Sequence, residues 1–129
     1  MKINRLLYLT IVLFFLVSLV ACSSVDQAGK TVEQYLNALV NKDVEQMVSL
    51  SCSEWEESAI QQADSFQAVK TQLKDLSCKE TGTESDISLV ICGGSIVATY
   101  DAEEQVFPLD RQTYLVKNND GEWCINGTR

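Results

Sequence analysis

The chain has 129 residues, which is enough for one domain rather than two. Its ten basic and 18 acidic residues give a formal net charge of −8, which argues against binding to nucleic acid or to anionic lipid head groups. It has no histidine and no CxxC motif, which excludes a Cys/His zinc site and leaves a catalytic thiol without a histidine to activate it.

The first 21 residues have the pattern of a secretion signal. Lys2 and Arg5 provide a positive start, and residues 6–21 form a nearly uninterrupted apolar run that ends in a small residue. A helix that crosses a bilayer needs about 20 apolar residues, so this run is slightly short. The pattern therefore predicts a cleaved signal peptide over residues 1–21, with an uncleaved N-terminal anchor helix as the alternative.

The end of this segment resembles the lipobox of bacterial lipoproteins. Leu19-Val20-Ala21-Cys22 has an aliphatic residue three positions before the cysteine and a small residue directly before it. The resemblance implies cleavage after Ala21, with a diacylglycerol on the Cys22 thiol and a fatty acyl group such as palmitate on the new N-terminus. Two or more acyl chains hold a protein stably at a membrane, so residues 22–27 would form a lipidated tether.

This lipid anchor sets the expected location. The residue after Cys22 is Ser23 and not aspartate. In a bacterium with two membranes this resembles the signal for transfer to the outer membrane, so we expect a cell-membrane or outer-membrane protein that faces outside the cytoplasm. Cleavage removes two basic residues and no acidic ones, which changes the formal net charge from −8 to −10.

The first half of the mature chain has helical periodicity. Apolar residues over about 27–41 recur with a 3.6-residue period, and Asp26 is placed to cap their first turn. Asp43 and Gln46 have the spacing of a capping box, which predicts a second, short helix.

Two further helices are predicted after these. Ser53 and Glu56 repeat the capping-box spacing. A last helix is expected after Ser65, and its apolar side would consist of Phe66, Val69, Leu73 and Leu76. Glycine and proline are absent from residues 30–81, which favours helices throughout the first half.

The second half has the pattern of β-strands. A turn is expected at residues 81–85, and residues 86–100 then carry one non-polar face through Gly93-Gly94. These glycines fit either a two-residue hairpin or one long strand with a bend. The bent strand is favoured because the non-polar face keeps its register through the glycines.

Two more strands complete the predicted sheet. After a turn at 101–105, residues 106–117 are expected to form one strand, and Pro108 near its start places that end at an edge or bulge. A tight turn at 118–121 precedes a closing strand at 122–126. Helices followed by antiparallel strands predict an α+β domain over residues 28–129.

Four cysteines remain in the mature domain besides Cys22. Their even number in an exported chain predicts two disulfides. The four candidates are Cys52, Cys78, Cys92 and Cys124.

The pairing of these cysteines stays open among three possibilities. A turn near Ser85 would place Cys78 opposite Cys92, which leaves Cys52 and Cys124 to pair by exclusion. Against this, Trp123 and Ile125 are expected to share the core face of their strand, which would direct Cys124 the other way.

Residues 32–50 and 113–125 are similar to the opening helix pair and the closing hairpin of the nuclear-transport-factor-2-like (NTF2-like) superfamily. The resemblance implies a cone, in which N-terminal helices pack on a curved antiparallel sheet and enclose a cavity. Family enzymes place an aspartate, histidine or tyrosine in that cavity. Here the candidate pocket residues are Tyr35, Tyr100 and Tyr114, with Asp110 as the carboxylate that an enzyme would need.

A buried tyrosine more often packs its ring and bonds its hydroxyl to a neighbour than acts on a substrate. We therefore expect no catalytic residue, no metal and no cofactor beyond the lipid on Cys22. The predicted function is that of a membrane-anchored extracytoplasmic domain with a binding or interaction role, towards a protein or small-molecule partner and not towards nucleic acid. The alternatives are a small-molecule carrier or sensor that uses the cone cavity, and an isomerase- or dehydratase-like enzyme.

Overall fold

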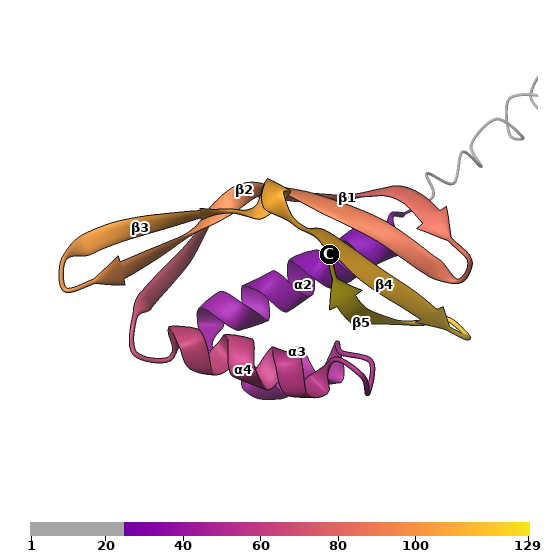
Figure 1. Cartoon of the computed structure of the whole chain (residues 1–129), viewed down its shortest axis with the longest axis horizontal. Helices are drawn as coiled ribbons and strands as arrows, with labels where there is room; N and C mark the ends of the chain where they lie inside the picture. The colour runs from indigo at the N-terminus through magenta and orange to yellow at the C-terminus, as the bar shows by residue number, and fades with distance from the viewer. Residues whose placement is uncertain (1–24) are drawn as a thin grey trace, which may run out of the picture.

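The computed structural model describes residues 25–129, which form three α-helices followed by a five-stranded antiparallel sheet (Figure 1). The predicted α+β class is confirmed. The predicted signal peptide and Cys22 lie outside the described residues.

Two helices begin where their capping residues predict. Helix α2 (Gln27–Asn41) starts after Asp26, whose carboxylate accepts a backbone N–H of the first turn at 2.7 Å. Helix α3 (Val44–Ser49) starts after Asp43, which does the same at 3.0 Å. In each case a side-chain oxygen satisfies an amide that the helix itself cannot pair.

The third helix, α4 (Glu56–Phe66), has no side-chain cap. Its capping position is Trp55, and the hydroxyl of Ser53 donates to Glu54 at 3.2 Å instead of capping the helix. The helix exists as predicted, but the predicted capping box is wrong.

The predicted last helix is wrong beyond Phe66, because residues 70–84 form strand β1 (Lys70–Glu84). The cause is a β-bulge between Lys74 and Ser77, where the pairing register with the next strand shifts. Core-facing residues of a strand recur every two positions, and a bulge adds one. Leu73 and Leu76 both pack on the core across this bulge, so their spacing of three imitates a helix.

Strand β2 (Ile87–Tyr100) runs through both glycines without interruption, so the bent-strand prediction is confirmed and the turn before it shortens to residues 85–86. The predicted face is buried at Val90, Cys92, Ile96 and Ala98. Gly94 has a φ of +91°, and a Cβ there would collide with the backbone of the β1 bulge. The bend thus depends on glycine at this position.

The predicted single strand 106–117 is wrong. After a two-residue turn at 101–102, the chain forms β3 (Glu103–Pro108), a 3₁₀ turn η1 (Leu109–Arg111) and β4 (Thr113–Asn119). Strands β3 and β4 lie end to end along the same edge of β2, where β3 pairs with residues 95–100 and β4 with residues 87–91. Pro108 ends the edge strand β3, so its predicted edge position is confirmed.

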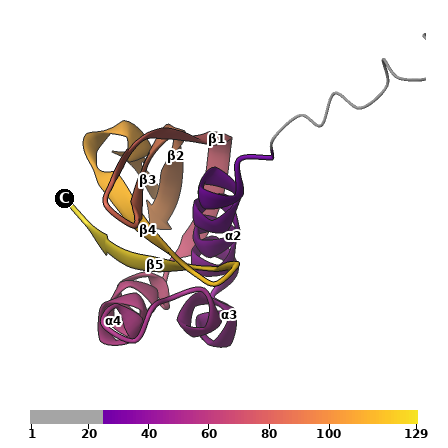
Figure 2. The same ribbon diagram turned by 90° about the vertical axis from the view of Figure 1, so that its right-hand side faces the viewer.

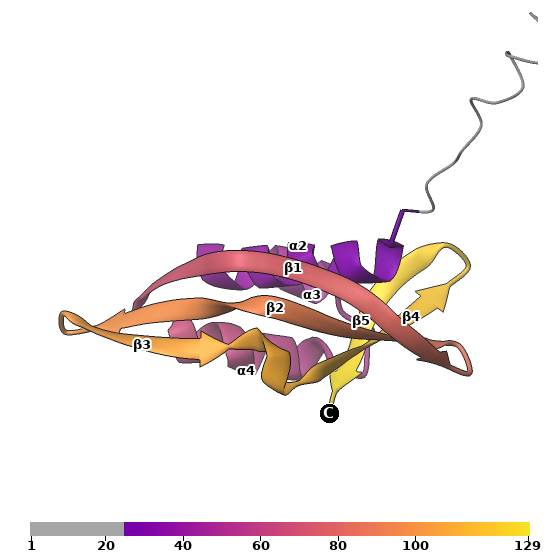
Figure 3. The ribbon, with the colours of Figure 1, turned by 90° about the horizontal axis from the view of Figure 1, so that it is seen from above.

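The closing strand, β5 (Glu122–Thr128), pairs with β4, and the sheet order is β1-β2-β4-β5 with β3 beside β2 (Figure 3). The curved sheet covers the helices on one face, with α3 and α4 side by side beneath β5 (Figure 2). The core between them contains Val32, Leu36, Met47, Val116 and Ile125, all of them 0–1% exposed.

Two disulfides join the cysteines as Cys52–Cys124 and Cys78–Cys92. Cys78 and Cys92 are direct partners in the β1–β2 register, as the turn near Ser85 predicts. Both disulfides are typical of an oxidising, extracytoplasmic compartment.

The chain before α4 explains how Cys124 can pair with Cys52 although Ile125 faces the core. Residues 50–52 run beside β5, where the amide of Ile125 donates to the carbonyl of Leu50 and the amide of Cys52 donates to the carbonyl of Ile125, both at 2.8 Å. Ile125 can therefore face the core while Cys124 meets Cys52 at the sheet margin.

Candidate functional site

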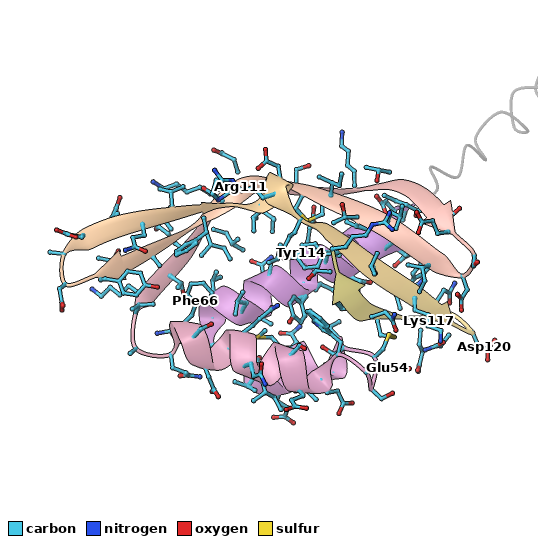
Figure 4. The ribbon with its side chains drawn as sticks, viewed as in Figure 1. Glu54, Phe66, Arg111, Tyr114, Lys117 and Asp120 are labelled. Carbon is cyan, nitrogen blue, oxygen red and sulfur yellow. A yellow bond between two sulfur atoms is a disulfide. The ribbon has the colours of Figure 1, made fainter. Side chains whose placement is uncertain are left out.

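Two of the three candidate pocket tyrosines lie in the interior between the sheet and the helices. Tyr35 on α2 is 0% exposed and Tyr114 on β4 is 2% exposed. Tyr114 is labelled in Figure 4. Tyr100 is half-buried at the far end of β2, beside the turn that leads to β3, and is not part of this core. The fold therefore brings Tyr35 and Tyr114 into one core and leaves Tyr100 outside it.

The two buried hydroxyls have partners within the protein. The Tyr35 hydroxyl donates to Oε1 of Gln62 at 2.8 Å and accepts from Nε1 of Trp55 at 3.2 Å. The Tyr114 hydroxyl accepts from Nε2 of Gln112 at 2.7 Å. Across residues 25–129 every buried side-chain nitrogen or oxygen has a hydrogen-bond partner. These tyrosines therefore stabilise the core as hydrogen-bonded aromatic residues.

Burial also makes both tyrosine hydroxyls weaker acids than an exposed tyrosine. It raises the pKa of Tyr35 to about 12, although the hydrogen bond from Trp55 opposes the change. Burial raises the pKa of Tyr114 to about 12 as well, with an opposing contribution from Gln112 and a smaller supporting one from Tyr35. Both side chains stay protonated near neutral pH and are poor general bases there.

Asp110 does not form the carboxylate–tyrosine pair that the enzyme alternative needs. It lies on η1 and is exposed to solvent, as is its neighbour Arg111 on the outer side of the sheet (Figure 4). Within the described part of the chain, no group of three or more histidine, cysteine, aspartate or glutamate residues is arranged to hold a metal ion.

Three surface hollows lie away from the tyrosines. One of about 500 Å³ lies beside the Cys52–Cys124 disulfide, and one of about 290 Å³ lies along α3. A third, of about 470 Å³, is lined by Lys42, Lys70 and Glu104 among others. Nζ of Lys42 already donates to the carbonyls of Gln67 and Val69, at 2.9 and 2.6 Å, so its charge is engaged within the protein.

The outer edges of the sheet differ in how their backbone is covered. On β1, the amide of Cys78 donates to Oε1 of Glu33 at 2.9 Å, and the amide of Glu80 donates to Oδ2 of Asp26 at 2.8 Å. Both carboxylates come from α2 or its cap, so the helix covers the middle of this edge. The middle of the β5 edge is covered by the chain at residues 50–52. Unpaired edges invite other strands, and these two edges are protected.

Strand β3 has no such cover among the described residues. It pairs only with β2, and all six of its residues are exposed. The exposed fraction is 60% for Val106 and 38% for Phe107. The end of the β2–β3 hairpin projects beyond the helices (Figures 1 and 3).

The hairpin geometry shows which backbone groups of β3 face outwards. Asp101 and Ala102 form a two-residue turn with positive φ angles of 45° and 72°, so Tyr100 and Glu103 are the first hydrogen-bonded pair. Hydrogen-bonded and non-hydrogen-bonded pairs alternate along an antiparallel ladder. The N–H and C=O groups of the next residue, Glu104, and of Val106 therefore point away from β2.

Phe107 fixes the base of this strand. Its ring meets Phe66 of α4 edge to face, with centroids 5.9 Å apart. Phe66 lies on the inner side of the sheet (Figure 4), so Phe107 faces that side too. Successive side chains of a strand point to opposite faces, so Val106 lies on the outer side. The sequence placed residues 106–109 at an edge because of Pro108, but gave no sign that β3 and β4 are separate strands.

Comparison with known proteins identifies the fold and not a family. No protein-family model and no curated protein matches this chain. Among solved structures, it is similar to RPA3114, a SEC-C motif containing protein from Rhodopseudomonas palustris, with 10% identity, a TM-score of 0.52, and coverage of 77% of this chain and 74% of that one. A designed NTF2-like protein, Rd1NTF2_05, is 13% identical with a TM-score of 0.51, over 81% of this chain and 96% of the other.

A third similar structure is the helical cell shape determining protein Pgp2 from Campylobacter jejuni, at 12% identity with a TM-score of 0.51. The match covers 77% of this chain but only 38% of Pgp2. Such low identities show a shared fold alone. The expected α+β architecture is confirmed, and it is similar to that of the designed NTF2-like protein.

Proposed function

We propose that this chain is a lipid-anchored extracytoplasmic lipoprotein domain that binds a partner through its surface. The anchor rests on Leu19-Val20-Ala21-Cys22 at the end of a complete signal pattern. The two disulfides support the same address, because they persist in oxidising compartments. Within residues 25–129, no helix has the length and apolarity to cross a bilayer.

The tether is short. Five residue steps separate Cys22 from the start of α2 at Gln27, and an extended chain covers at most about 3.6 Å per step. A lipidated Cys22 would therefore keep the domain within roughly 20 Å of the membrane. The net charge of −10 after cleavage disfavours direct adhesion to anionic head groups, so the exposed surface remains available.

The proposed binding role rests on the hydrogen bonds that the interior tyrosines make within the protein. Tyr35 and Tyr114 are buried and hydrogen-bonded within the protein, which favours surface recognition over chemistry or carriage inside the cone. The carrier alternative needs a ligand to reach these side chains. It would be favoured by a small apolar ligand that raises the Tm of the protein but does not raise the Tm of the Tyr114→Phe variant.

The anchor is tested by expressing the full chain and its Cys22→Ala variant in a bacterial host with an alkyne analogue of palmitate. The wild-type protein should carry the label and sediment with membranes, and its N-terminal peptide should begin at Cys22 with the mass of a diacylglycerol and one fatty acyl group. Cys22→Ala should lose the label and that mass. An intact Met1, or a processed N-terminus without acyl mass, would refute the lipoprotein assignment.

A further inference from the structure

We propose that the outer edge of β3 is the docking strand of this domain, and that an extended basic segment of a partner protein adds to the sheet there. This inference rests on the proposed binding role and names its surface. The partner segment would pair with the outward N–H and C=O groups of Glu104 and Val106.

The first argument is the contrast between the edges of one sheet. Two outward amides in the middle of β1, those of Cys78 and Glu80, are occupied by carboxylates, and the middle of β5 is paired with residues 50–52. The corresponding groups of β3 have no partner among the described residues, although β3 lies in the same sheet. A backbone ladder that is left open on an exposed strand is a template for another strand.

The second argument is the side-chain pattern beside this edge. Val106 is 60% exposed on the outer side, and Phe107 is 38% exposed on the inner side while its ring is held by Phe66. An added strand with an apolar residue beside Val106 would bury part of this surface. Glu103 and Pro108 bound the edge, so the ladder is short and fits a segment of about five residues.

The third argument is charge. Asp101, Glu103 and Glu104 gather at the tip of the hairpin, in a chain with a net charge of −8. Lys70 is on the same face as Glu104 but on the far side of β2, because both residues pair with Thr99. The edge therefore favours lysine or arginine in the added strand. A second copy of this chain brings the same negative charge and is disfavoured.

The test uses the full-length lipidated protein in detergent micelles and a fluorescent peptide, acetyl-Lys-Thr-Val-Thr-Lys-amide, in which the valine and both lysines share one face, followed by fluorescence anisotropy. Saturable binding is expected, and the matched acidic peptide with glutamate in place of both lysines should bind at least about fivefold more weakly. Equal binding of the two peptides, or no binding of either, would overturn the proposal.

Proline variants test the backbone pairing itself. Glu104→Pro removes an outward N–H that β2 does not use, so the hairpin should keep its fold, which a thermal melt checks. One lost hydrogen bond is expected to weaken peptide binding about three- to tenfold. Glu104→Gln is the matched control, because it removes the charge and keeps the N–H, so its loss should be smaller. If Glu104→Pro and Glu104→Gln bind the peptide with the same affinity, the edge is not the docking site.

Two further measurements separate this inference from its alternatives. Sedimentation of the protein alone should show a monomer, and a dimer that Glu104→Pro dissociates would overturn the proposal by making the edge a contact between copies. Cys22→Ala should bind the basic peptide as tightly as the wild type, because the anchor plays no part in pairing. Failure of peptide binding in a protein that carries the acyl mass would refute the docking strand and leave the anchor intact.

Discussion

The two disulfides should contribute unequally to stability, because they close loops of different length. The Cys52–Cys124 disulfide spans 72 positions and the Cys78–Cys92 disulfide spans 14. Closing a loop restricts the unfolded chain, and the free energy gained grows with the logarithm of loop length. These separations give about 4.5 kcal/mol for the long loop and about 3 kcal/mol for the short one, a difference of roughly 1.5 kcal/mol.

Single-disulfide variants isolate each contribution. One variant, Cys78→Ala with Cys92→Ala, keeps only the long-range disulfide, and the other, Cys52→Ala with Cys124→Ala, keeps only the short-range one. The free energy of unfolding of each is measured by urea denaturation with and without excess reductant. Reduction leaves two thiols in nearly the same space, so the change reports loop closure rather than lost packing. The variant with all four alanines should not respond to reductant.

Reduction should lower the free energy of unfolding more in the variant that keeps Cys52–Cys124 than in the variant that keeps Cys78–Cys92. The difference corresponds to about 5–10 °C in Tm for a domain of this size. Each variant is compared with its own reduced form, so a difference in stability between the two oxidised variants does not affect the result. An equal cost, or a larger cost for reducing Cys78–Cys92, would refute the loop-length argument. It would point instead to structure in the unfolded chain around the β1–β2 hairpin.

Three other changes follow from backbone angles and burial. Gly94→Ala should destabilise the fold by about 3 kcal/mol or more in urea denaturation, because the new Cβ collides with the carbonyl of Lys74. The control Gly121→Ala is also at positive φ but in open space, so it should destabilise the fold by only about 1 kcal/mol. Equal losses of stability in the two variants would contradict the predicted clash. Ala102→Gly should stabilise the protein by about 1 kcal/mol, because Ala102 has a φ of 72°, and an unchanged urea midpoint would show that the turn is unstrained. Burial raises the pKa of Tyr114 from 10 to about 12, so the stability that its protonated hydroxyl provides is complete below pH 10 and should be lost as the pH rises from 10 to 12. Tyr114→Phe should therefore flatten the decline of the urea midpoint over that range. An identical decline in the wild type and the variant would contradict this prediction.

Much of the local structure followed from the sequence. Asp26 and Asp43 start the first two helices because their carboxylates satisfy amides within the same turn, an interaction confined to four residues. A turn near Ser85 places Cys78 within one position of Cys92 by counting along two paired strands, and the register shift between Glu80 and Gly82 makes the two cysteines direct partners.

The errors arose where a long-range contact decided the local conformation. The bulge between Lys74 and Ser77 forms against Gly94, which lies nearly 20 positions further along the chain, and it hides the two-residue period of β1. No local pattern distinguishes Leu73 and Leu76 in this bulged strand from the same spacing on a helix. The break at η1 has the same character, because Leu109 is buried only once β3 and β4 share one edge of β2.

The candidate site divides in the same way. The sequence by itself determined the lipobox pattern at Cys22, the four paired cysteines and the aromatic residues available to a pocket, because these depend on residue type and order. Only the tertiary structure decided that Tyr35 and Tyr114 bond inside the core, and that β3 keeps an open edge while α2 covers β1. Burial and edge coverage depend on which distant segments meet, and sequence order does not specify that.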